Sequence, residues 1–437
     1  MKTVAYHNLG CKVNSYEMDA MIQALRQKGY RIVPFEEKAD IYIVNTCTVT
    51  NIADRKSRQM LHKAKKTNPE GIVVAVGCYV QSDAQAVEAD SAVDLLIGNN
   101  RKKNLVEILE SYFEGVMQES VIDINHTSEY EEMQLTTTAE HTRAYIKIQD
   151  GCNQFCTYCM IPYARGRVRS RRKQDVLREI EGLAAAGYKE FVLTGIHISS
   201  YGMDFKEDQE ENLLTLVQAI DTVKGVERIR LGSLEPRIVT EAFTRGLAEL
   251  KHICPHFHLS LQSGCETVLK RMNRHYTPEQ YLNGVEFLRR AFVHPAITTD
   301  VIVGFPGETE EEFAAGRQFV ETVGFYEMHI FKYSRRKGTK AAVMPMQVSE
   351  AEKTTRSGVL QSIEKRDSKD FRSYYLSKNV EVLFEEKKEI AGKEYWIGHT
   401  REYVKVAVPA HEKTLENQLV TGKIEGFLDD EIIIMQD

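Results

Sequence analysis

Six of the eight cysteines in this chain of 437 residues form two groups of three, and a group that shares one site restricts how the chain can fold. The compact group lies in Gly151-Cys-Asn-Gln-Phe-Cys-Thr-Tyr-Cys159 and consists of Cys152, Cys156 and Cys159. The dispersed group consists of Cys11, Cys47 and Cys78. Because thiolates are the usual ligands of iron–sulfur clusters, the pattern predicts two metal centres.

The compact group does not have the surroundings of a protein core. A lone cysteine is usually a small buried hydrophobe, and we predict that Cys254 and Cys265 are of this kind and bind no metal. Three cysteines within eight residues, beside Asn153, Gln154 and Thr157, are better explained as ligands. A four-iron cluster needs one ligand per iron, so a loop with three cysteines leaves one iron open to an exchangeable ligand.

Each cysteine of the dispersed group follows a strand-like apolar run, at residues 3–7, 41–44 and 71–76. Strands of an open parallel sheet present their carboxyl ends at one edge, where ligands usually bind. This placement predicts one shared site, whereas three unrelated core cysteines are the alternative. Asn14 and Glu17 form a candidate capping pair for a helix that ends near Lys28.

Further strand-like runs lie at 144–148, 190–193, 228–231, 257–259, 297–303 and 327–331, and helical patterns separate them. Six such units predict a partial parallel barrel, with a doubly wound open sheet as the alternative. In such barrels the functional residues gather on loops at the carboxyl ends of the strands. The predicted loops contain the compact cysteines, Thr194 with Gly195 and His197, Glu235, Gly264, Gly304 with Glu308, and Arg335.

Several of these loop residues have a plain structural explanation as well. Gly195 and Gly264 are suited to ordinary turns, and Glu308 to the acidic first turn of a helix. His197 is open between a structural and a ligand role. A carboxylate such as Glu235, at a strand end, is suited to binding ribose hydroxyls.

A basic run follows the compact cysteines and has a second cluster further along the chain. Its cations, which we predict to contact RNA phosphates, are Arg165, Arg167, Arg169, Arg171, Arg172, Lys173, Arg335 and Arg336. The alternative is a solvated charge run that opens a helix. The net charge of −6 means that nucleic acid must be held by local patches of this kind.

The remaining segments complete a predicted α/β organisation. Residues 1–120 form an open parallel α/β domain, 121–142 a polar linker, 143–372 the barrel with a charged final helix, and 373–437 a small antiparallel barrel of five short strands. No apolar run reaches ~18 residues and no secretory pattern opens the chain, so we expect a cytoplasmic protein without a membrane partner. Dispersed cysteines in a long chain favour thiolate ligands over disulfides.

The Cys-x3-Cys-x2-Cys spacing of Cys152, Cys156 and Cys159 resembles the signature of radical S-adenosylmethionine enzymes. The last ~65 residues, with Thr421-Gly-Lys-Ile-Glu, resemble a TRAM domain, an RNA-binding appendage. Together with the three-cysteine first domain, this order resembles the methylthiotransferases. Leu9-Gly-Cys-Lys-Val-Asn14 is similar to the branch that acts on N6-threonylcarbamoyladenosine beside the tRNA anticodon, and differs by two residues from the branches acting on isopentenyladenosine or on a ribosomal-protein aspartate.

The resemblance implies two 4Fe-4S clusters and S-adenosylmethionine as cofactors. The cluster on Cys152, Cys156 and Cys159 cleaves S-adenosylmethionine to a 5'-deoxyadenosyl radical, which removes a hydrogen from carbon 2 of the adenine. The cluster on Cys11, Cys47 and Cys78 presents sulfur, and a second S-adenosylmethionine supplies the methyl group. The residues implied to bind S-adenosylmethionine are Thr194, Gly195, Glu235, Gly304 and Glu308. The implied partners are tRNA, a flavodoxin- or ferredoxin-type electron donor and a sulfur donor.

Two functions of other classes are alternatives. An iron–sulfur electron carrier or redox sensor needs no pocket for S-adenosylmethionine, and the loop signatures after the predicted strands oppose it. An RNA-binding module with structural zinc needs four ligands per ion, and neither group offers an obvious fourth.

Overall fold

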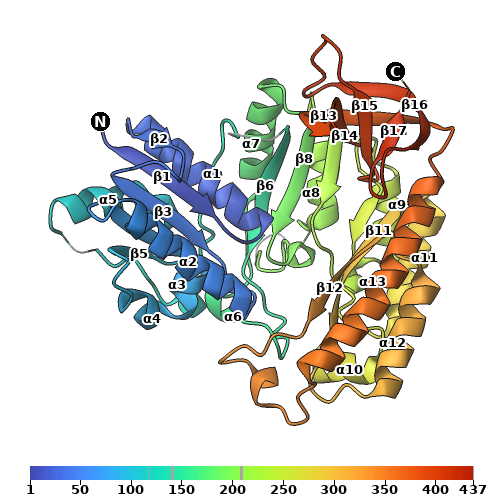
Figure 1. The fold of residues 1–437 in the computed structure, drawn as a ribbon, viewed down its shortest axis with the longest axis horizontal. Coiled ribbons are helices and arrows are strands. Elements are labelled where there is room, and N and C mark those ends of the chain that lie inside the picture. Colours follow the sequence, from blue (N-terminus) through green and yellow to red (C-terminus); the bar gives the residue numbers. More distant parts are fainter. Residues whose placement is uncertain (117, 139–141, 207–209, 437) are drawn as a thin grey trace.

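The computed structural model describes residues 1–116, 118–138, 142–206 and 210–436. Three parts follow one another along the chain (Figure 1). A parallel sheet with its helices, blue in the figure, lies beside a central set of strands coloured green to orange, and a small barrel in red lies at the top. The α/β class predicted from the sequence is confirmed.

The first sheet has the order β2-β1-β3-β4-β5, and every neighbouring pair is parallel. Its strands are β1 (Thr3–Asn8), β2 (Arg31–Val33), β3 (Ile41–Thr46), β4 (Ile72–Gly77) and β5 (Leu95–Ile97). Its helices are α1 (Lys12–Gln27), α2 (Asn51–Thr67), α3 (Cys78–Ser82), α4 (Ala84–Glu88) and α5 (Leu105–Phe113). All six residues of β3 are buried, as expected for a central strand covered on both faces.

The central strands run in chain order and form the predicted partial barrel. One sheet has the order β7-β6-β8-β9 and the other β10-β11-β12, and isolated parallel bridges at Ile229–Ile253 and Leu234–Leu259 connect the two. The parallel strands are β6 (Arg143–Asp150), β8 (Glu190–Gly195), β9 (Arg228–Leu231), β10 (His256–His258), β11 (Ala296–Val303) and β12 (Glu327–Lys332); β7 (Arg169–Ser170) pairs antiparallel to β6. A doubly wound sheet would require a reversal of strand order, which these strands do not show.

Helices line the outer face of these strands. They are α7 (Lys173–Ala185), α8 (Leu213–Asp221), α9 (Glu241–Ala248), α10 (Glu266–Arg271), α11 (Pro278–Ala291), α12 (Glu310–Val323) and α13 (Glu350–Ser373), whereas the short α6 (Ile161–Ala164) contacts α3 of the first part. Five of them start at a capping side chain, namely α8 at Asn212, α9 at Thr240, α11 at Thr277, α12 at Thr309 and α13 at Ser349. Helix α1 of the first part packs against β6 and β8, so one hydrophobic core spans both parts.

The C-terminal strands close into a barrel of order β13-β14-β15-β17-β16. They are β13 (Asn379–Ile390), β14 (Lys393–His399), β15 (Lys405–Pro409), β16 (Leu419–Phe427) and β17 (Ile433–Met435). The pairs are antiparallel except β15 with β17, which is parallel and closes the barrel. This barrel contacts the amino ends of the central strands: Arg143 pairs with Glu385, and Arg228 donates to the Glu381 carboxylate and the His399 carbonyl.

The structure bears on two further predictions, for Asn14 with Glu17 and for residues 121–142. The capping pair predicted at Asn14 and Glu17 is wrong, because α1 begins at Lys12 and both residues are buried inside the helix. The polar stretch predicted as a linker buries Ile124, Met133 and Leu135. Residues 139–141 of that stretch lie outside the described residues.

Candidate active site

The dispersed cysteines lie at one edge of the first sheet. Cys11 lies between β1 and α1, Cys47 directly follows β3, and Cys78 is the first residue of α3 after β4. Because β1, β3 and β4 are parallel neighbours, their carboxyl ends bring the three side chains together. Cys11 is exposed, whereas Cys47 and Cys78 are buried. Burial raises the pKa of the Cys47 thiol to about 11, and the neighbouring thiols of Cys78 and Cys11 add to that rise.

Arg165 reaches this edge from the central barrel. Its Nε donates a hydrogen bond to Cys78 Sγ at 3.2 Å, and one of its terminal nitrogens donates to Asn14 Oδ1 at 2.6 Å. The same guanidinium pairs with Glu17, which also pairs with Lys102 and Lys147. A fully buried cluster of charges therefore joins the first sheet to the barrel directly behind one cysteine sulfur.

The compact cysteine loop follows β6 and is held by backbone contacts on both sides. Cys152 N–H donates to the Gly166 carbonyl at 3.0 Å, and Thr157 N–H donates to the Met272 carbonyl at 3.0 Å. Gly151 needs its glycine because its φ is +72° and a Cβ there would overlap the Arg167 carbonyl oxygen. The loop is thus fixed before any ligand binds.

The sulfur atoms of this loop face one another and one arginine. Arg274 donates to Cys156 Sγ at 3.4 Å, and Ile161 N–H donates to Cys159 Sγ at 3.4 Å. Burial raises the pKa of Cys159 to about 12 and that of Cys152 to about 11, and Cys156 raises both further. Each cysteine group therefore has one guanidinium that donates to one of its sulfurs, fully buried for Arg165 and partly buried for Arg274.

The residues predicted to contact S-adenosylmethionine lie on the loops at the same ends of the strands. Thr194 and Gly195 end β8, and Glu235 follows β9. The Glu235 carboxylate accepts from Arg237 Nε at 2.8 Å, and its charge acts on the Cys152 thiol. These positions adjoin the compact cysteine loop.

Glu308 lies after β11 and has a definite structural role. Its Oε2 accepts from Gly304 N–H at 2.6 Å and from Arg356 at 2.8 Å. Gly304 has φ +70°, and a Cβ there would overlap the Lys353 side chain. The carboxylate therefore closes this turn and connects it to α13. It precedes the helix cap at Thr309, so it is not a residue of the first helical turn.

His197 and the two remaining cysteines are also placed. The His197 Nδ1 lies 2.7 Å from Ser200 Oγ, and its Nε2 is buried without a hydrogen-bond partner. Burial, with Arg274 and Arg237 nearby, lowers the pKa of His197 to about 4, so the ring is neutral at pH 7. Cys254 is fully buried beside Arg230, and Cys265 precedes α10.

The basic run is not one exposed strip. Arg165, Arg169 and Arg171 are at most 1% exposed, and Arg336 is 6% exposed. Arg171 pairs with Glu132 and Glu179, Arg169 donates to the carbonyls of Arg165 and Arg167, and Arg336 pairs with Asp54. Burial and internal partners exclude these four from contact with RNA phosphates in this arrangement. Arg172 and Arg335 are exposed, and Arg167 and Lys173 are partly exposed.

Sequence reasoning missed the residues that surround the cysteines. Arg274 lies in no recognisable motif, and Glu17 was interpreted only as a capping residue. Asn99, whose Nδ2 lies 3.6 Å from Cys78 Sγ, was also overlooked. These side chains reach the sulfurs only in the folded chain, and no local sequence spacing predicts their contact with the cysteines.

The donor sets fit iron–sulfur clusters better than single ions. Each group offers three cysteine thiols, and among the residues that the structure describes neither has a histidine or carboxylate beside them as an obvious fourth ligand for a single zinc ion. A cluster of four irons is wider than one ion and needs thiolates that stand further apart. N–H donors reach the sulfurs of Cys78, Cys156 and Cys159, and hydrogen bonds of this kind tune such clusters.

Comparison with known proteins agrees with this arrangement. A family model described as the Radical SAM superfamily matches residues 146–320, and one described as Uncharacterized protein family UPF0004 matches residues 3–98. The chain is 41% identical to the threonylcarbamoyladenosine tRNA methylthiotransferase MtaB of Bacillus subtilis, over 97% of this chain and 94% of the relative. It is 33% identical to a tRNA-2-methylthio-N(6)-dimethylallyladenosine synthase of Pelotomaculum thermopropionicum, over 87% of this chain and 86% of the relative.

The fold is also found among solved structures. The radical S-adenosylmethionine methyltransferase TsrM of Kitasatospora setae aligns with a TM-score of 0.59 at 16% identity, covering 78% of this chain and 77% of that one. In the described part of the chain, no helix is both long and apolar enough to span a bilayer.

Proposed function

The chain belongs to the radical S-adenosylmethionine tRNA methylthiotransferases, and from this membership we propose that it methylthiolates carbon 2 of N6-threonylcarbamoyladenosine beside the tRNA anticodon. The observation that carries the proposal is the 41% identity over nearly the whole chain to a relative named for that substrate. Residues Leu9 to Asn14, which surround the first cysteine, agree with the same branch.

The two cysteine groups have separate roles in this proposal. We assign the radical-generating cluster and S-adenosylmethionine to Cys152, Cys156 and Cys159, and an auxiliary cluster that holds sulfur to Cys11, Cys47 and Cys78. When bound, these cofactors supply the electron, the radical and the sulfur that the reaction needs, while the protein binds, orients and excludes water. Arg274 and Arg165 donate to one sulfur of each group and so stabilise negative charge there.

The binding of S-adenosylmethionine falls to the loops after β8, β9 and β11. We assign Glu235 to accept hydrogen bonds from the ribose hydroxyls, and Thr194 with Gly195 to form the adjoining wall. Glu308 acts through the turn at Gly304, which it holds in place. The neutral ring of His197 leaves its Nε2 free to accept a hydrogen bond beside this site.

For the tRNA we retain Arg167, Arg172, Lys173 and Arg335 as phosphate contacts, together with the C-terminal barrel. Arg172 stacks over Phe205 at 4.8 Å and Arg167 over Phe155 at 4.6 Å, which places cations next to aromatic faces. Cationic and aromatic side chains together suit single-stranded RNA. A cytoplasmic location and separate electron and sulfur donors follow from this function.

The substrate is tested with purified, cluster-reconstituted enzyme, S-adenosylmethionine and reductant. One tRNA carries N6-threonylcarbamoyladenosine and the other isopentenyladenosine, and mass spectrometry of the nucleosides identifies the product. We expect 2-methylthio-N6-threonylcarbamoyladenosine only. Product on isopentenyladenosine alone would assign the chain to the branch of its 33% identical relative.

The division of labour is tested with cysteine variants. Cys156→Ala should abolish cleavage of S-adenosylmethionine and therefore all product. Cys47→Ala should retain reductive cleavage and lose sulfur insertion, because only the auxiliary cluster is removed. Cys265→Ala, a cysteine outside both groups, is the control and should retain both activities. Equal loss of cleavage in Cys47→Ala and Cys156→Ala would contradict separate roles.

A further inference from the structure

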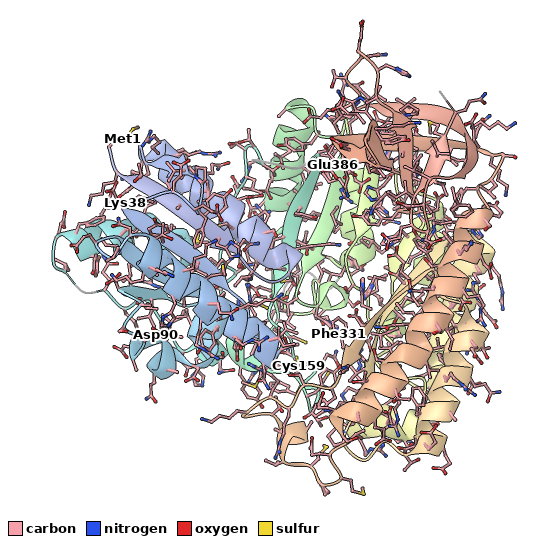
Figure 2. The ribbon with its side chains drawn as sticks, in the orientation of Figure 1. Met1, Lys38, Asp90, Cys159, Phe331 and Glu386 are labelled. Carbon is pink, nitrogen blue, oxygen red and sulfur yellow. The ribbon has the colours of Figure 1, made fainter. Side chains whose placement is uncertain are left out.

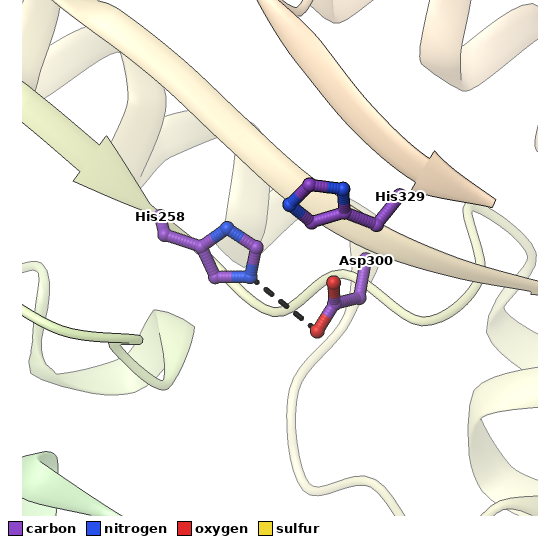
Figure 3. Close-up of side chains that lie close together, drawn as sticks. All are labelled: His258, Asp300 and His329. Carbon is purple, nitrogen blue, oxygen red and sulfur yellow. Dashed lines mark ion pairs between the residues drawn. The ribbon is translucent and has the colours of Figure 1, made fainter. Parts of the chain in front are cut away.

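Three neighbouring strands of the barrel place two histidines and an aspartate side by side. His258 is the last residue of β10, Asp300 lies in β11 and His329 in β12 (Figure 3). Asp300 and His329 are direct partners in the parallel register, and His258 is the partner of Thr298, two residues before Asp300. Because side chains alternate along a strand, Thr298 and Asp300 point to the same face as both histidines.

That face is turned away from the helices that cover the barrel. The alternate residues Phe257, Thr299 and Val301 are buried on the helix side. In contrast, the side chain of Asp300 is 29% exposed, and His329 is an exposed residue. The three ligand groups therefore lie on the inner face of the barrel strands, and the partial exposure of Asp300 and His329 would leave positions on a bound ion free for further ligands.

The spacing and hydrogen bonding suit a metal ion. One ligand atom from each of the three residues lies within 4.8 Å of the other two. His258 Nδ1 lies 3.0 Å from Thr298 Oγ1, which orients the ring. The opposite nitrogen, Nε2, faces Asp300 Oδ2 at 3.4 Å, yet it is buried and makes no hydrogen bond. A buried imidazole nitrogen that faces a carboxylate and has no hydrogen-bond partner is suited to bind a cation, which would satisfy both groups.

We propose that His258, Asp300 and His329 bind a divalent first-row transition-metal ion inside the barrel. Two imidazoles and one carboxylate on one face leave open coordination positions, and imidazole favours zinc, iron, cobalt or nickel over magnesium or calcium. The site uses none of the cysteines. It rests on the positions of these three side chains and stands independently of the tRNA substrate.

The test uses the full chain with both cysteine groups filled by reconstituted clusters, so that free thiols do not capture the probe. Co²⁺ alone is titrated by calorimetry, and its position is then found from the difference between anomalous maps recorded just above and just below the cobalt edge, which separates cobalt from iron. We expect one ion between the three side chains. Asp300→Asn keeps the shape and removes the charge, and His329→Ala removes an exposed ligand; each should weaken Co²⁺ binding by at least about tenfold.

His62→Ala is the matched control, because His62 is also a histidine beside a carboxylate, 3.0 Å from Asp90, but belongs to no three-residue ligand group among the described residues. It should leave Co²⁺ affinity unchanged. Unaltered cluster absorbance and circular dichroism show that the variants are folded. Absence of cobalt from the three side chains in the diffraction map, or affinity unaffected by both Asp300→Asn and His329→Ala, would overturn the proposal.

Discussion

Arg165 connects two parts of the molecule through a single side chain. It bonds to Cys78 Sγ and Asn14 Oδ1 of the first sheet, and with Lys102 and Lys147 it surrounds the buried carboxylate of Glu17. Burial opposes ionisation of Glu17, but the three cations outweigh it and hold the pKa of this carboxyl well below its usual range. Arg165 therefore contributes both to stability and to the surroundings of Cys78.

Arg165→Met should lower the free energy of unfolding by roughly 3–5 kcal/mol, because it leaves buried partners without their cation. Urea unfolding followed by circular dichroism measures this change. Arg172→Met is the control from the same basic run, where the side chain is exposed, and should cost less than about 1 kcal/mol. Similar losses in the two variants would mean that the buried cluster adds nothing to stability.

Gly151 offers a second test at the scale of one residue. Gly151→Ala should displace the compact cysteine loop, because the new Cβ meets the Arg167 carbonyl and the backbone has φ +72°. We expect failure to assemble the radical-generating cluster, read as loss of iron and of S-adenosylmethionine cleavage. Gly187→Ala shares the positive φ, at +99°, but has no atom within 4 Å of its Cβ, so it should cost only about 1 kcal/mol of stability and keep the cluster. Normal iron content in Gly151→Ala would contradict this account of the loop.

At the scale of elements, strands were predictable and the partners of charged residues were not. The apolar runs before Cys47 and Cys78 are continuous and bounded by polar residues, so their period and length identify buried strands. Arg165, by contrast, pairs with Glu17, 148 positions away, and nothing local distinguishes it from a solvated arginine. The convergence of the cysteines followed from strand placement, whereas the arginines that contact them depend on how whole elements pack.

The ion pair between Arg356 and Glu308 connects helix α13 to the turn after β11. Burial raises the pKa of Glu308, so the loss of Arg356 should favour its protonation and loosen the turn at Gly304. Arg356→Met should therefore weaken binding of S-adenosylmethionine by roughly 5- to 100-fold, the effect of about 1–3 kcal/mol. Calorimetry with S-adenosylmethionine measures it.

Arg366→Met provides the control on the same helix, since Arg366 is 57% exposed and pairs only with the adjacent Asp367 in the described structure. It should bind S-adenosylmethionine as the wild type does. Unchanged affinity in Arg356→Met would show that the turn does not depend on α13.

At the scale of the whole molecule, the C-terminal barrel and the cysteine loops lie at opposite ends of the central strands. Figure 2 labels Cys159 beside the first sheet and Glu386 on the C-terminal barrel, well separated in the view. Strand β6, with 8 residues, spans about 26 Å at ~3.3 Å per residue. If the C-terminal barrel holds the tRNA, as proposed, the RNA has to extend along the central strands for its modified base to reach the cysteine loops, and docking of that barrel then sets the geometry of the complex.

Glu190 stabilises this docking and provides a test by pH. It accepts from Arg230 Nε at 2.8 Å, and Arg230 in turn donates to the Arg401 carbonyl of the C-terminal barrel. Burial disfavours the charged form of Glu190. The positive charges of Arg230, Arg143 and Arg228 outweigh this effect and lower the pKa of Glu190 to about 2. Since the unfolded value is about 4.3, its stabilising effect is complete above that pH and is lost as pH falls toward 2.

Glu190→Gln should therefore destabilise docking by roughly 3–5 kcal/mol at pH 7, and the difference from wild type should shrink as pH falls from about 4.3 toward 2. Trp396, the single tryptophan of the chain, lies in β14 and reports unfolding of the C-terminal barrel by fluorescence during a guanidinium titration. Glu227→Gln, an exposed position just before β9, is the control and should match wild type at every pH. Coincident Trp396 transitions for Glu190→Gln and wild type at pH 7 would exclude Glu190 from holding the barrel in place.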